Sequence, residues 1–160
     1  MDTILVPVSP GELLDKITIL RIKSQRMSDP QKLANVRHEL ELLDKITILR
    51  IKSARMTDAT KVANVRLELS LLEKTWRDSV DASIDLAADE RALHAVNERL
   101  WVIEDDIRDK ERAQAFDAKF IELARAVYVE NDERAAVKKR INLKLGSRIV
   151  EEKSYKPYKA

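Results

Sequence analysis

Two segments in the C-terminal half of the chain carry residues whose types and spacing suit a metal or ligand site. In the acidic run VNERLWVIEDDIRDKE (residues 96–111), Glu104 and Asp105 are the candidate metal ligands, because carboxylates along a helix can hold Mg²⁺. The paired acidic spacing of helical Mg²⁺-dependent hydrolases is not cleanly present, and Arg108 and Lys110 supply oppositely charged partners. Two interpretations stay open: a solvated face with internal ion pairs, or a metal or ligand site.

The second segment, FIELARAVYVENDERAAVKKRIN (residues 120–142), places polar residues where a helix should face the core. Asn131, Arg134 and Lys138 continue the apolar stripe that the neighbouring residues define. Polar groups at core-facing positions are costly unless they are paired. They either pair structurally or line an anion pocket for a phosphate or carboxylate.

The polar residues of the two segments form one candidate ligand site. The helix that contains residues 96–111 has an apolar stripe typical of a core, and the polar candidates lie beside it. The apolar stripe consists of Leu93, Val96, Leu100, Ile103 and Ile107. The candidate ligand-binding residues are Trp101, Asp105, Arg108, Asn131, Arg134 and Lys138. We expect Mg²⁺ as a cofactor only if these residues form a ligand site, and no cofactor otherwise. Other catalytic chemistry finds no support: there is no Cys, two Gly cannot build a phosphate loop, and His38 and His94 have no triad-like neighbours.

Helices must position these side chains. Ser9-Pro10-Gly11-Glu12 is a capping box that starts a helix reaching about Met27. Further stop-and-restart signals predict helices from Ala59 to Ser79, from Leu86 to Arg112, and from Asp117 to Leu145, where Gly146 is a suitable C-terminal cap. Residues 1–8 are predicted to be an extended arm and 146–160 an irregular tail.

A tandem repeat occupies the N-terminal half. Residues 41–69 repeat residues 12–40 at an offset of 29, with differences at six positions and with the first 13 residues identical. This is a recent duplication, a crossover between two related genes, or a designed repeat. Because 29 residues make about eight helical turns, one copy can be inserted into a helix without rotating the faces of the residues downstream.

Nothing interrupts the helical pattern at the junction of the two copies, Leu40-Glu41. The sequence therefore predicts one helix of about 26 residues, roughly 40 Å long, from Pro30 to the next stop at Thr57-Asp58. Its first half has an apolar stripe that includes Leu43, and its second half has another on the opposite side. The helix is either buried all round, or packs first on the preceding helix and then on the next one.

Composition limits the partners. With 30 Lys and Arg against 28 Asp and Glu, the charges are balanced and interleaved, which argues against a nucleic-acid partner. No apolar stretch approaches the roughly 20 residues of a membrane span. The first residues do not resemble a signal peptide, and the absence of Cys fits a cytoplasmic protein. The excess apolar surface of the first helix favours a homodimer or a higher homo-oligomer.

Four segments carry a resemblance to a known family: SPGELLDKITIL, NVRHELELL, VNERLWVIEDDIRDKE, and INLKLGS with VEEKSY near the end. Together they are similar to an uncharacterised bacterial and phage protein family, over nearly the whole chain. The family has a single copy of the repeated segment, which the present chain carries twice. The resemblance implies a small helical protein, and it transfers no activity and no catalytic residue.

The sequence thus predicts a single all-α domain over residues 1–160, a long-helix antiparallel bundle of about five helices with a duplicated helix-turn-helix segment. Residues 86–145 are its helical hairpin. We expect a non-enzymatic interaction or scaffold protein that self-associates. The alternative is a small protein that binds a nucleotide or sugar phosphate, or hydrolyses it with Mg²⁺.

Overall fold

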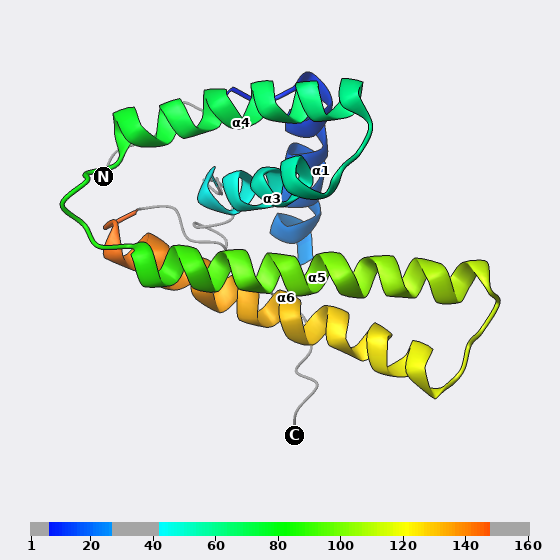
Figure 1. The fold of residues 1–160 in the computed structure, drawn as a ribbon. Coiled ribbons are helices and arrows are strands. Elements are labelled where there is room, and N and C mark those ends of the chain that lie inside the picture. Colours follow the sequence, from blue (N-terminus) through cyan, green and yellow to red (C-terminus); the bar gives the residue numbers. More distant parts are fainter. Residues whose placement is uncertain (1–6, 27–41, 148–160) are drawn as a thin grey trace.

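The protein is all-α in the part that the structure describes. The computed structural model describes residues 7–26 and 42–147, in which no strand occurs (Figure 1). The helices are α1 (Pro10–Arg26), α3 (Leu42–Arg55), α4 (Ala59–Ser79), α5 (Ala87–Arg112) and α6 (Ala118–Lys144). This confirms the predicted helical fold class.

Capping chemistry sets the helix ends where the sequence predicts them. Asp58 accepts a hydrogen bond from the backbone N–H of Lys61 at 2.9 Å and begins α4, while Asp117 accepts one from Phe120 at 3.0 Å and begins α6. The bounds of α4 are those predicted, and α1, α5 and α6 agree within one residue at each end.

The C-terminus of α6 is closed by Gly146, as predicted. Its φ of 60° lies in the left-handed region that glycine adopts without a steric penalty. The Gly146 N–H donates to the carbonyl of Leu143 at 3.1 Å, and the Ser147 N–H donates to that of Asn142 at 2.9 Å. These two bonds are the Schellman pattern, which satisfies carbonyls at a helix end.

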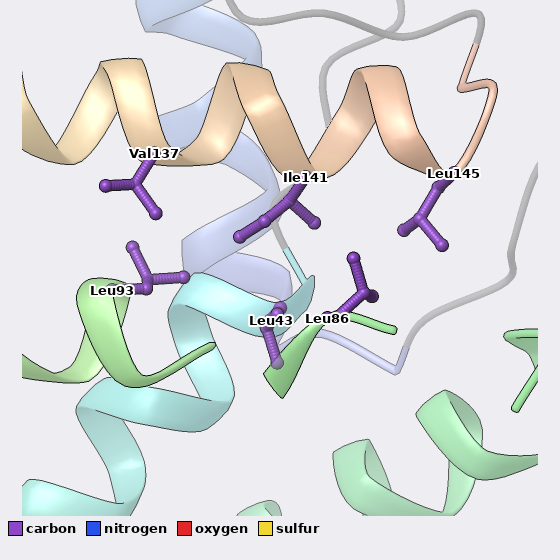
Figure 2. Packing of buried hydrophobic residues seen from close by; sticks show 6 residues of the cluster. All are labelled: Leu43, Leu86, Leu93, Val137, Ile141 and Leu145. Atoms are coloured by element: carbon purple, nitrogen blue, oxygen red, sulfur yellow. The ribbon is translucent and has the colours of Figure 1, made fainter. Parts of the chain in front are cut away.

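The main hydrophobic core lies where α3 meets the antiparallel pair α5 and α6. Figure 2 shows the side chains that converge there, which are Leu43, Leu86, Leu93, Val137, Ile141 and Leu145. Leu93 and Val137 are fully buried. The sequence pattern assigns Leu43 to a stripe facing the first helix; in the structure it belongs to this cluster with residues of α5 and α6, because α3 packs on α5.

A second core cluster joins α3 to α4. Leu42, Ile46 and Leu49 of α3 pack on Leu72, and Val65, Leu69 and Trp76 of α4 are half-buried against the same cluster. This confirms that the second half of the predicted long helix packs forward on the next one. Because α3 has buried residues on both sides, most of its surface is covered, which also agrees with the alternative of a helix buried all round. The predicted continuity through Leu40-Glu41 lies outside the described residues.

Helix α1 has the sequence of α3 but not its surroundings. It lies across the direction of α5 and α6 (Figure 1), and it belongs to none of the three helix pairs that pack extensively within the described ranges. Leu14 is 61% exposed and Ile22 52%, whereas Leu43 and Ile51, the same residues in the second copy, are 5% and 2% exposed. Helix α3 of the second copy therefore belongs to the core, whereas Leu14 and Ile22 of α1 lie outside it.

Candidate functional site

A pocket of about 520 Å³ opens between α3, α5 and α6. Its volume is within the usual range for small-ligand sites. The helices α5 and α6 lie side by side (Figure 1), so residues from the two predicted segments reach it from both sides. The lining residues are Ile48, Asn97, Leu100, Trp101, Glu104, Asp105, Arg108, Asn131 and Arg134.

The apolar part of the pocket is formed by Ile48, Leu100 and Trp101. Leu100 is buried, and the other two are half-buried, so that they are open to a ligand on one side. An indole face in such a position can stack on a planar group or contact a sugar.

The rim on α5 carries both signs of charge. Arg108 forms an ion pair with Glu104 one turn earlier, at 3.1 Å, and also donates to the Glu104 carbonyl at 3.0 Å. Its side chain remains largely exposed, and Asp105 on the same rim is exposed as well. The internal ion pair matches the interpretation of a solvated, paired face, while the exposure leaves both rim residues accessible to a ligand.

The wall on α6 is formed by Asn131 and Arg134, which are half-buried. The Asn131 amide donates to the carbonyl of Val127 at 2.8 Å. The Arg134 guanidinium lies 3.5 Å from Asn97 Oδ1, at the long end of the hydrogen-bond range. This weak contact leaves most guanidinium donors for other acceptors, because the group carries five N–H bonds.

Beneath the pocket is a buried polar network that ties α3 to α5. The Asn97 amide donates to Asp44 Oδ1 at 2.9 Å and to Thr47 Oγ1 at 2.8 Å, and Thr47 donates to the Asp44 carbonyl at 2.8 Å. On the far side, Lys138 Nζ lies 3.8 Å from Asp44 Oδ2. All four residues are buried, so the network replaces the hydration that these groups lose and fixes the floor of the pocket.

The structure brings together most of the predicted site residues. Trp101, Asp105, Arg108, Asn131 and Arg134 line one pocket with Glu104, whereas Lys138 lies deeper and pairs with Asp44. The sequence does not predict the roles of Asp44 and Thr47, because the identical residues Asp15 and Thr18 occur in the first copy. The structure shows that Asp15 and Thr18 are exposed on α1.

A second cluster of charges joins the start of α5 to the end of α6. Lys144 Nζ contacts the buried carboxylate of Asp89 at 2.6 Å, and Arg140 contacts it at 3.3 Å. The hydrogen bond from Lys144, and then that from Arg140, lower the pKa of Asp89 below its ordinary value, against the opposite effect of burial. This cluster holds the open ends of the hairpin together, away from the pocket.

The described residues contain no group of three or more potential metal-ligating side chains. Glu104 and Asp105 are adjacent at the rim and remain candidates for a metal only as a pair. No helix in the described part is long and apolar enough to cross a membrane.

Comparison with known proteins gives no match to a family model, to a curated protein or to a solved structure. The family resemblance of the four sequence segments therefore stays a prediction, and the function has to be argued from the surfaces of this molecule.

Proposed function

We propose that the protein is a non-enzymatic helical interaction module that self-associates through the exposed apolar side chains of α1. The observation that carries this proposal is the exposure of Leu13, Leu14, Ile19 and Ile22 on one helix. These are four large aliphatic side chains within 10 residues, and exposed apolar surface that gathers in one region marks interaction sites.

Three of these four side chains are suited to burial, because their counterparts in α3 are buried. Leu42, Leu43 and Ile51 of α3 are at most 7% exposed, and they are the counterparts of three of the exposed residues of α1. The shape and the polarity of these side chains are therefore suitable for packing against other helices.

The occupant we propose is α1 of a second copy. Of its charged residues, Glu12, Asp15 and Lys16 lie in the first half of the helix, whereas the second half carries only basic ones, Arg21, Lys23 and Arg26. Antiparallel pairing of two α1 helices about a two-fold axis sets the half that holds the acidic residues opposite the basic half. A contact of one helix per subunit is small, so the dimer is weak and depends on concentration.

Sedimentation velocity over a wide concentration range tests this proposal. The wild type should change from monomer to dimer, and Leu14→Glu should remain monomeric at concentrations where the wild type is dimeric. Leu71→Glu is the matched control, because Leu71 of α4 is similarly exposed, at 46%, but lies outside α1. A wild type that stays monomeric throughout, or a Leu71→Glu variant that loses the dimer equally, contradicts the proposal.

A second candidate function is supported by the pocket. It combines an indole, two guanidinium groups and two amides, which can bind a phosphorylated ligand with a planar group, together with two carboxylates at the rim. In this proposal Arg134 and Arg108 bind the phosphate, Trp101 stacks on the base or sugar, and Glu104 with Asp105 holds Mg²⁺ where hydrolysis occurs.

Thermal melting with nucleotides and sugar phosphates, with and without Mg²⁺, tests the second candidate. A ligand that binds only the folded state raises the melting temperature, by several degrees when it is far above its dissociation constant. The Trp101→Ala and Arg134→Gln variants should lose this shift, whereas Arg125→Gln on the same helix should retain it. No shift with any ligand would leave only the interaction module.

The compartment that we propose is the cytoplasm, which the absence of Cys supports. The balanced charges support protein rather than nucleic acid as the partner.

A further inference from the structure

The surface that holds α3 is formed by three other helices. We call it the α3 seat: Leu72 of α4, Leu93 and Asn97 of α5, and Val137 and Lys138 of α6. We propose that the seat binds either copy of the repeat, so that α1 can replace α3 as its occupant.

The identity of the contact residues is the first argument. Residues 13–24 of α1 are identical to residues 42–53 of α3, which include every buried residue of α3. The polar contacts are duplicated as well, since Asp15 and Thr18 match Asp44 and Thr47. A helix that presents the same atoms in the same order makes the same contacts with the seat.

The positions of the differences are the second argument. In the second copy, where burial can be read, all six differing positions are exposed or half-buried. They are Ala54, Thr57, Ala59, Thr60, Val62 and Leu67. The divergence between the copies therefore leaves the buried surface of α3 unchanged.

The connection to α4 decides which copy is preferred. Three residues (56–58) join α3 to α4, whereas 32 residues (27–58) separate the end of α1 from α4. Because loop-closure entropy grows with the logarithm of loop length, the longer connection disfavours α1 by roughly 30-fold. The amount of buried apolar surface does not change when α1 replaces α3, since α3 becomes exposed as α1 becomes buried. The α1-seated state is then a minor population, on the order of 3%.

A double-mutant cycle tests whether the two helices share one seat. Ile46 is fully buried in α3, and its copy in α1 is Ile17. Ile46→Asp should lower the folding equilibrium constant by no more than roughly 30-fold, because α1 then takes the seat. Ile17→Asp alone should change it little. In the Ile17→Asp background, Ile46→Asp should abolish folding, since neither copy can be buried. Equal effects of Ile46→Asp in both backgrounds, including complete unfolding in both, would overturn the proposal.

Cross-linking gives a structural readout, and the absence of Cys makes the chain suitable for it. Arg50 of α3 contacts Glu90 of α5, and its copy is Arg21. The Arg21→Cys/Glu90→Cys variant, treated with a short thiol cross-linker, should accumulate an intramolecular bridge slowly, and rapidly when Ile46→Asp is added. The Arg50→Cys/Glu90→Cys control should bridge at once. No bridge from position 21 in either background contradicts the exchange. Working at dilutions where the protein is monomeric separates this test from that of self-association.

Discussion

Helices α1 and α3 are the same sequence in two environments. Over residues 13–24 and 42–53 the two series of side chains are identical, yet Leu13 is 51% exposed and Leu42 only 7%. Thr18 bonds to carbonyls of its own helix, whereas Thr47 also receives the amide of Asn97 from α5. An amphipathic pattern therefore makes a helix suitable for burial, but it does not by itself provide the site where the helix is buried.

The difference arises from the rest of the chain. Only one α4–α5–α6 surface is present for two equal helices, and α3 is the one joined to it by a short connection. Arg50 of the seated helix binds both Glu73 of α4 and Glu90 of α5, and Lys45 contacts Glu68 at 2.7 Å. Because Arg21 and Lys16 repeat these residues in α1, the contacts do not favour one copy over the other, and since they are partly exposed each stabilises the fold only slightly.

The largest effect is expected where no second copy exists. Leu93 of α5 is fully buried and has no duplicate, so Leu93→Asp places an unpaired carboxylate in the core. The free energy lost through Leu93→Asp should exceed the unfolding free energy of a small domain, which is roughly 5–15 kcal/mol. Circular dichroism should then show no cooperative unfolding transition. Ile46→Asp, which α1 can compensate, is the comparison. If the two variants are equally unfolded, the duplicated region tolerates a buried carboxylate no better than the α5–α6 hairpin does.

A smaller effect is expected from a pair of matched substitutions in the two copies. Thr47→Val removes a buried hydroxyl that accepts from Asn97, and it should lower the unfolding free energy by about 1–2 kcal/mol. Thr18→Val changes an exposed hydroxyl and should stay within about 0.5 kcal/mol. Urea denaturation monitored by Trp fluorescence measures both. Equal losses would mean that α1 is buried as α3 is.

The smallest effect concerns acid stability and the charge cluster of the hairpin. Because the pKa of Asp89 is lowered in the folded state, its contribution is fully present above the ordinary carboxyl pKa of about 4 and is lost as the pH falls through the lowered value. Asp89→Asn should therefore cost about 1 kcal/mol at pH 7 and flatten the loss of stability below about pH 4. A profile that is the same in wild type and Asp89→Asn would contradict this role.

Much of the fold depends on local chemistry and could be predicted. Asp58, Asp117 and Gly146 fix helix ends through bonds to nearby backbone groups, so their positions can be read from the sequence. The pocket residues could be selected because Asn131 and Arg134 lie on the core-facing stripe of one helix, and Trp101, Asp105 and Arg108 lie on the stripe that flanks the core-facing residues of its neighbour. The separation of Lys138 from the pocket could not, because it depends on Asp44 of a helix distant in sequence. Nor could the sequence show which copy is buried, since the copies are identical where they would touch the core.

In the second copy, the confinement of the six differences to exposed and half-buried positions has an evolutionary consequence under the proposed exchange of α1 and α3. A gene that encodes two interchangeable helices tolerates a harmful change in either one, because the intact copy can fill the vacated place. Selection then acts weakly on each copy separately and strongly on the pair. Such a chain can accumulate substitutions until one helix acquires a binding role of its own, while the other helix continues to complete the core.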